Sequence, residues 1–370
     1  MVDKKDKPLF TPGPLTTSTT VKEAMLRDLG SRDGEFISVV KKIRERLLKL
    51  AGVSQSQGWE AVLMQGSGTF AIESVISSIT PPEGKWLVVI NGAYGERLLK
   101  IIERHGFAVD AIRNAENELP NIASIKSTLA KGGFTHVAVV HCETTSGIMN
   151  PVADIGAATK AAGCVYFVDS MSAFGGVEFA FEACQMDFLV SSANKCVQGV
   201  PGFGFALCRR AALEATEGYS RTFSLDLLAQ WRGLEGNGQF RFTPPTHTLL
   251  AFARALDELE GEGGIPARAA RYRKNHETCV TGMRAMGFTE YVPEDLQGHI
   301  ITSFVYPTED FDFEEFYDRL NDKGFVIYPG KVTKANCFRI GHIGHLFAED
   351  TEMLLSAIRE VAGEMGLSLA

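Results

Sequence analysis

The chain has 370 residues, of which 45% are hydrophobic and 22% are charged, and this is an ordinary globular composition. Its formal net charge of −8 provides no basic footprint for nucleic acid, and we find neither a membrane-spanning apolar run nor a signal peptide. The seven cysteines lack CxxC spacing, so we expect reduced thiols in a cytoplasmic protein and no disulfide framework or zinc site.

Residues 1–20 are predicted to form an N-terminal arm, because Pro12, Gly13 and Pro14 oppose helix and favour a turn. Short apolar segments then alternate with amphipathic ones. The predicted strands cover residues 61–65, 86–90, 135–141, 164–169, 187–192 and 203–208, and the predicted helices cover residues 35–53, 69–80, 95–106 and 154–163. Because the strand segments are apolar on both faces, we predict an α/β fold with a mainly parallel sheet that is covered on both sides.

The pattern of alternating strands and helices changes after about residue 246. A long helix over residues 249–264 leads into helices and strands of different spacing, and the chain ends in a predicted helix after Ala348. We therefore predict a large α/β domain over residues 21–255 and a smaller C-terminal α+β domain over residues 256–370.

Ligands of parallel α/β sheets bind beyond the carboxyl ends of the strands, so the residues that follow each strand are the candidates for a site. Gly66-Ser67-Gly68-Thr69 follows the first strand and starts a helix, where small residues and free N–H groups form a cup for a phosphate. A plain strand-to-helix turn explains the same residues. Tyr94 follows the second strand and could stack on a flat ring, or be an ordinary partly buried tyrosine.

Three further strand ends carry polar groups. Thr144 lies in a hydroxyl-rich loop that turn chemistry alone would explain. Asp169 directly follows an apolar strand, and the neighbouring strand ends offer no further ligands for a metal. Lys195, 26 residues later, is either a surface lysine or a lysine whose pKa is lowered for nucleophilic chemistry.

One cofactor requires this combination. Pyridoxal 5'-phosphate needs a glycine-rich helix start for its phosphate, an aspartate for its ring nitrogen and a lysine for its aldehyde. An aromatic face beside the flat ring completes the set. A single residue set meets all four demands, and we prefer this interpretation to four independent coincidences.

Several sequence segments also resemble a known family. The layout with Asp169 and Lys195 resembles the fold type I, aspartate-aminotransferase-like pyridoxal phosphate enzymes, in the branch of alanine–glyoxylate and serine–pyruvate aminotransferases. Nearly the whole chain resembles the 2-aminoethylphosphonate–pyruvate transaminase family within it. The segments that carry this resemblance include "LFTPGPLTTSTTVKEAML", "LMQGSGTFAIESV", "SSANKCVQGVPG", "SLDLLAQWR", "RFTPPTHT", "GFVIYPGK" and "CFRIGHIG".

The resemblance implies a transaminase that moves the amino group of 2-aminoethylphosphonate to pyruvate, giving phosphonoacetaldehyde and L-alanine in phosphonate degradation. The reaction would be ping-pong and pass through pyridoxamine phosphate. The resemblance also implies a homodimer with shared active sites.

The resemblance further implies a role for each matching position. Lys195 would hold the cofactor and shuttle a proton, Asp169 would pair with the ring nitrogen, and Tyr94 would stack on the ring. Thr144 would contact the phenolic oxygen of the ring, and Arg339 would bind the anionic group of the substrate. The residues around the phosphate would be Ser67, Gly68, Thr69 and Asn194, together with Thr243 and Thr246 of the neighbouring subunit.

Other questions stay open at this stage. A phosphonate carries more charge than a carboxylate, so a second donor beside Arg339 is expected, and the candidates are Arg32, the backbone near Gly13, and Lys331. The rival functions are an aminotransferase for alanine, serine or glyoxylate, a cysteine desulfurase, and a non-enzymatic protein that keeps a degenerate cofactor fold.

Overall fold

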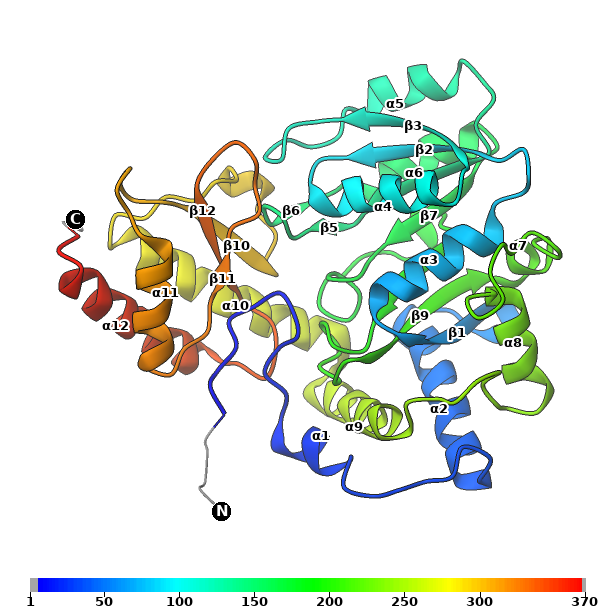
Figure 1. The fold of residues 1–370 in the computed structure, drawn as a ribbon, viewed down its shortest axis with the longest axis horizontal. Coiled ribbons are helices and arrows are strands. Elements are labelled where there is room, and N and C mark those ends of the chain that lie inside the picture. The colour runs from blue at the N-terminus through cyan, green and yellow to red at the C-terminus, as the bar shows by residue number, and fades with distance from the viewer. Residues whose placement is uncertain (1–5, 368–370) are drawn as a thin grey trace.

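The computed structural model describes residues 6–367 and contains a seven-stranded sheet in the order β1-β9-β8-β7-β4-β2-β3 (Figure 1). Its strands are β1 (Trp59–Gly66), β2 (Lys85–Ile90), β3 (Ala108–Arg113), β4 (His136–Val140), β7 (Val165–Asp169), β8 (Phe188–Ser192) and β9 (Gly202–Arg209). The five strands from β3 to β8 run parallel, and β9 runs antiparallel to both β8 and β1. The predicted α/β fold with a mainly parallel sheet is confirmed.

Helices surround this sheet, some packed against its strands and others against neighbouring helices. They are α1 (Thr19–Glu23), α2 (Gly34–Leu50), α3 (Gly68–Ile79), α4 (Ala93–Arg104), α5 (Ile122–Leu129), α6 (Val152–Ala161), α7 (Arg210–Glu214), α8 (Leu227–Gly236) and α9 (Thr246–Glu262). Helix α3 contacts β1, β8 and β9, while α4 contacts β2, β3 and β4. A short hairpin of β5 (Cys142–Glu143) and β6 (Ile148–Met149) follows β4.

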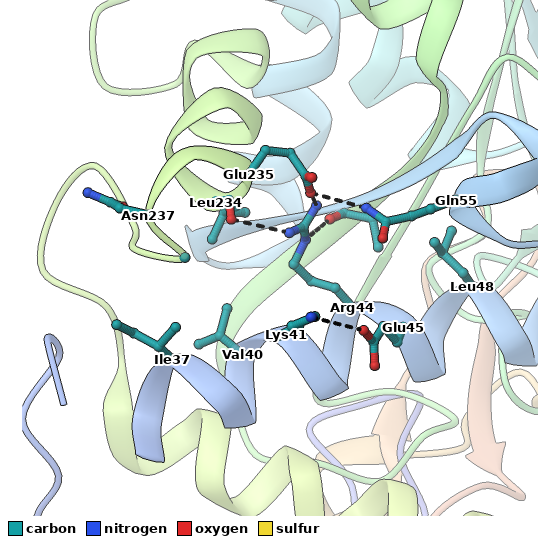
Figure 2. Close-up of a pocket in the computed structure, with 12 residues that line it drawn as sticks. Ile37, Val40, Lys41, Arg44, Glu45, Leu48, Gln55, Leu234, Glu235 and Asn237 are labelled. Carbon is teal, nitrogen blue, oxygen red and sulfur yellow. Dashed lines mark hydrogen bonds and ion pairs between the residues drawn. The ribbon is translucent and has the colours of Figure 1, made fainter. Parts of the chain in front are cut away.

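A buried arginine fixes helix α2 to the sheet. Arg44 donates from Nε to the carbonyl oxygen of Ala61 in β1 at 2.7 Å, and its Nη2 lies 3.3 Å from Glu60 Oε2. Figure 2 shows Arg44 reaching from α2 toward Glu235 of α8, with which it also pairs. A buried charge is tolerated only when it is paired and hydrogen-bonded, and Arg44 meets this condition.

The C-terminal part forms a separate antiparallel sheet in the order β10-β12-β11, on the left in Figure 1. Its elements are α10 (Gly264–Arg284), β10 (Ile301–Val305), α11 (Phe313–Asp322), β11 (Tyr328–Pro329), β12 (Cys337–Gly341) and α12 (Ala348–Glu364). One apolar core draws its residues from Val21 to Leu259. A second core takes residues from Cys279 to Val361 and also Phe10 from the arm.

Residues 1–5 of the predicted arm lie outside the described residues, and the part of the arm from residue 6 onward is attached to the C-terminal part. Leu9 forms a parallel bridge to Val326, and the amide of Phe10 donates to the carbonyl oxygen of Val326 at 2.8 Å. The predicted domain boundary at residues 255/256 falls inside α9, which packs against α1, α2 and α10.

The sequence pattern missed several elements, among them β3, α5 and α8. Strand β3 is half exposed at the edge of the sheet, so it lacks the continuous apolar run of the central strands. Strand β11 has only two residues.

No helix within residues 6–367 is long and apolar enough to cross a membrane. In the same range, no cluster of His, Cys, Asp and Glu side chains is placed to hold a metal ion.

Buried histidines should make the stability of the fold sensitive to acid. Burial lowers the pKa of His136, which stacks on Trp86, to about 4. Below the ordinary pKa of about 6.5 the unfolded chain takes up a proton that the folded chain refuses, so stability is lost as pH falls from about 6.5 toward 4. We expect His136→Gln to reduce this loss between pH 7 and pH 5 by about 2 kcal/mol, which is a few degrees in melting temperature.

The measurement compares the melting temperatures of the holoproteins at the two pH values. Trp86→Phe is the matched control, because it loosens the same stack but removes no titrating group, and it should keep the wild-type pH dependence. An unchanged pH dependence in His136→Gln would contradict the assignment.

Candidate active site

A cavity of about 200 Å³ lies where β4, β7 and β8 end. In Figure 1 the arrowheads of the parallel strands β2 and β3 point toward the β10-β12-β11 sheet, so this edge faces the C-terminal part. Nine of the residues predicted from the sequence line the cavity: Gly13, Ser67, Gly68, Thr69, Tyr94, Thr144, Asp169, Asn194 and Lys195.

The start of helix α3 forms one wall of the cavity. Ser67 is the N-cap residue, and its side chain makes no capping hydrogen bond, so the first N–H groups of α3 keep their capacity to bind an anion. Gly68 is buried, and a Cβ atom at this position would collide with Met171. A side chain at Gly68 would therefore require the end of the Met171 side chain to move.

Lys195 lies in the turn that follows β8 and is covered by the arm. Its Nζ donates to the carbonyl oxygen of Pro12 at 2.8 Å. Gly13 has a φ of +116°, and a Cβ there would lie 2.7 Å from Lys195 Cδ, so only glycine fits. Burial lowers the pKa of Lys195, and the charge of Arg97 acts in the same direction against the opposing charge of Asp169. A lowered pKa gives more of the neutral amine, which is the nucleophilic form.

Asp169 ends strand β7 and is 1% exposed. Its Oδ1 accepts a hydrogen bond from the amide of Met171 at 2.9 Å. Burial raises the pKa of Asp169, while the charges of Arg97 and Lys195 and the Met171 amide oppose that rise. A buried carboxylate with this surrounding is suited to hold a proton on a basic ring nitrogen.

Tyr94 lies in the first turn of α4, which begins at Ala93 rather than at the predicted Gly95. The buried Glu143 fixes this helix start, because its Oε2 accepts from the amide of Gly95 at 3.2 Å and its Oε1 from Thr145 Oγ1 at 2.6 Å. A carboxylate at a helix N-terminus is favourable, although burial raises its pKa. Glu143 thus positions Tyr94.

Arg97 also lines the cavity, and sequence reasoning did not find it. Its Cζ lies 4.6 Å from the centroid of the Tyr94 ring, and its buried Nε has no hydrogen-bond partner within residues 6–367. The sequence contained a signal for Arg97, because residues three apart in a helix share a face and Arg97 follows Tyr94 by three residues. Ser172 and Ser192 are further lining residues that we did not predict.

Arg339 is buried in β12 behind Thr144 and is not among the residues that line the cavity. Its Nη1 donates to the carbonyl oxygen of Thr144 at 2.7 Å, and its Nε donates to that of Pro329 at 2.9 Å. The guanidinium is therefore connected to the cavity through Thr144.

Two further predicted residues, like Arg339, lie outside the cavity in the single chain. Thr243 is exposed and lines a separate surface cavity together with Arg32. Thr246 begins α9. The segment before α9 is nevertheless held beside the α3 wall, because Gln65 Nε2 donates to the carbonyl oxygen of Phe242 at 3.0 Å.

The residues present fit pyridoxal phosphate. The free α3 N-terminus suits its phosphate, Asp169 its ring nitrogen and Lys195 its aldehyde, and all three border one cavity. The unpartnered Nε of Arg97 adds a cationic donor to the same cavity.

Comparison with known proteins agrees with this geometry. The class-V aminotransferase family matches residues 16–341. A 2-aminoethylphosphonate–pyruvate transaminase of Phocaeicola vulgatus is 47% identical over 96% of this chain and 98% of its own length. The enzyme of the same name from Bacillus cytotoxicus is 50% identical over 95% of this chain and 97% of its own length.

Solved structures share the fold. Pyridoxamine–pyruvate aminotransferase from Mesorhizobium loti has a TM-score of 0.90 at 23% identity and covers 100% of this chain and 95% of its own. Alanine–glyoxylate aminotransferase from Nostoc sp. has a TM-score of 0.90 at 22% identity and covers 97% of this chain and 96% of its own. With the lysine, the aspartate and the helix start in place for the cofactor, the chain belongs to the pyridoxal phosphate-dependent class-V aminotransferases, in the family of 2-aminoethylphosphonate–pyruvate transaminases.

Proposed function

We propose that the protein transfers the amino group of 2-aminoethylphosphonate to pyruvate, giving phosphonoacetaldehyde and L-alanine, as a step in phosphonate degradation. The observation that carries the proposal is identity of 47–50% over nearly the full chain to relatives that bear this name. The complete Lys195 cavity described above supports it.

Bound pyridoxal phosphate supplies an aldehyde that takes up the amino group and a ring that withdraws electrons from the substrate carbon. Asp169 would keep the ring nitrogen protonated from within a buried site. Tyr94 would stack on the ring, and Thr144 would contact its phenolic oxygen. The N-terminus of α3, with Ser67, Thr69 and Asn194, would hold the phosphate.

Lys195 does the proton transfer. Its Nζ would hold the cofactor at its aldehyde and would carry the proton that leaves the aminomethylene carbon of the substrate. Arg339 orients each substrate through its anionic group. Phosphonoacetaldehyde would leave before pyruvate enters, and the same lysine would then move the proton in the opposite direction, which predicts ping-pong kinetics.

We also assign a homodimer with shared sites to this protein. Phe223 and Phe242 are 78% and 40% exposed, and their ring centroids are 5.8 Å apart. The exposed Phe70 lies on the first turn of α3, at the phosphate end of the cavity. The adjacent exposed rings of Phe223 and Phe242 favour an interface, and a second copy there would bring Thr243 and Thr246 to its partner's phosphate. The seven cysteines are unpaired and buried, which supports a reducing, cytoplasmic environment.

The first test of the proposal is a coupled assay for alanine and phosphonoacetaldehyde. Wild type should form both from 2-aminoethylphosphonate and pyruvate. Lys195→Ala should lose turnover by at least about a hundredfold, because the proton carrier is gone, together with the visible absorbance of lysine-bound cofactor. Lys274→Ala, an exposed lysine on α10, is the matched control and should retain both. Turnover of serine without turnover of 2-aminoethylphosphonate would overturn the proposed substrate.

A second test uses mixed subunits. When Lys195→Ala and Thr246→Ala chains are unfolded and refolded together, the hybrid dimer has one doubly defective site and one intact site, provided that Thr246 serves the neighbouring subunit. We expect about a quarter of wild-type activity from a mixture of chains that are nearly inactive alone. If Thr246 serves its own subunit, no intact site forms and the mixture stays at the average of the two variants.

A further inference from the structure

Two anions of different size and charge must use one site in the proposed reaction. A carboxylate has two oxygens and one negative charge, whereas a phosphonate has three oxygens and a second ionisation. The guanidinium of Arg339 has five N–H donors, and backbone carbonyl oxygens of Pro329 and Thr144 already accept from two of its nitrogens. The remaining donors match the two oxygens of a carboxylate and leave a phosphonate undercompensated.

Lys331 lies where the additional charge is needed. Its Nζ is 4.6 Å from the ring centroid of Tyr94, a residue that lines the cofactor cavity. Lys331 follows β11 by two residues, and β11 is fixed by the hydrogen bond from Arg339 to Pro329. Arg339 therefore contacts one end of the segment 329–331, and Lys331 is the other end of this segment.

The backbone around Lys331 is constrained on both sides. A Cβ on Gly330 would collide with the carbonyl oxygen of Cys337, so the segment lies directly on β12 at this point. Beyond Lys331, the amide of Thr333 donates to Oε2 of the buried Glu116 at 2.8 Å, and its Oγ1 lies 3.2 Å from the same oxygen. Glu116 follows β3, so the loop crosses from the C-terminal part to the large sheet with Lys331 above Tyr94.

The charge of Lys331 is free for a ligand. Within residues 6–367 it forms no ion pair and no hydrogen bond with another side chain. Burial raises the pKa of the Tyr94 hydroxyl, but the charges of Lys195, Lys331 and Arg339 together lower it below its ordinary value. The Tyr94 hydroxyl therefore lies in the combined positive field of Lys195, Lys331 and Arg339.

The other cations nearby have different positions. Lys195 is reserved for the cofactor, and Arg97 is the cation whose charge acts most on Asp169, at the ring-nitrogen end. Arg32 lies beside Thr243 in the separate surface cavity and does not line the cofactor cavity of its own chain.

From this geometry we infer that Lys331 is a specificity-determining residue that binds the phosphonate of the amine substrate together with Arg339, and that carboxylate substrates use Arg339 without it. The inference rests on the proposed function and names the group that distinguishes the two substrates of that reaction.

The test measures the two half-reactions of the holoenzyme separately. In Lys331→Met we expect the KM for 2-aminoethylphosphonate to rise about tenfold, since one charge-assisted contact is lost, while the KM for pyruvate changes less than about twofold. Lys331→Arg should recover most of the affinity. Lys334→Met is the matched control, because Lys334 belongs to the same loop but lines an outer cavity with Glu116. It should leave both values unchanged.

A binding measurement without turnover uses ethylphosphonate and propionate, followed by the absorbance of the lysine-bound cofactor. Wild type should bind ethylphosphonate more tightly as its second proton dissociates, and Lys331→Met should lose this pH dependence while binding propionate as before. Equal losses for both anions, or no loss for ethylphosphonate, would overturn the role of Lys331. Wild-type turnover of 2-aminoethylphosphonate reports on the proposed function independently.

Discussion

The site depends on keeping two opposite charges apart at neighbouring strand ends. Asp169 and Lys195 follow the adjacent parallel strands β7 and β8, where two charges in a buried environment attract each other strongly. They form no ion pair with each other within the described residues 6–367. The Met171 amide holds the carboxylate at 2.9 Å and the Pro12 carbonyl holds the ammonium at 2.8 Å. The separation leaves the cavity into which a flat cofactor ring fits.

The N-terminal arm connects the position of Lys195 to the C-terminal part of the chain. Phe10 belongs to the core of the C-terminal part, and its carbonyl accepts from the amide of Gly341 at 2.9 Å, at the end of the strand that carries Arg339. Two residues later the arm supplies the carbonyl that holds Lys195. The turn of Lys195 and the strand of Arg339 are thereby connected through three residues of backbone (10–12). A loosening of the arm would affect the cofactor lysine and the substrate arginine together.

The sequence allowed the strand-end residues to be predicted, because parallel strands deliver their carboxyl ends to one edge whatever their exact lengths. Lys195, Asp169, Tyr94 and the α3 start were found in this way and line one cavity. The roles of Thr243, Thr246 and Arg339 came only from the family resemblance, since nothing in local spacing brings them near Lys195. Their roles stay predictions.

The features that were missed depend on three-dimensional contacts. Arg97 reaches the cavity from inside a helix and not from a strand end. Glu143 looked like a loop residue, yet it caps α4 across a gap of almost fifty residues. Strand β3 has alternating exposure at the edge of the sheet, and no apolar run marks it. The attachment of Lys331 through Thr333 to Glu116 joins two parts of the chain that no periodicity connects.

The central claim is that Lys195 holds the cofactor at this strand edge. Reduction of the holoprotein with borohydride followed by peptide mass mapping tests it directly, because the reduced bond to the lysine survives digestion. We expect the added cofactor mass on the peptide that contains Lys195 and on no other. Cofactor mass on a different lysine, Lys331 included, or no labelled peptide from a protein that carries the cofactor, would contradict it.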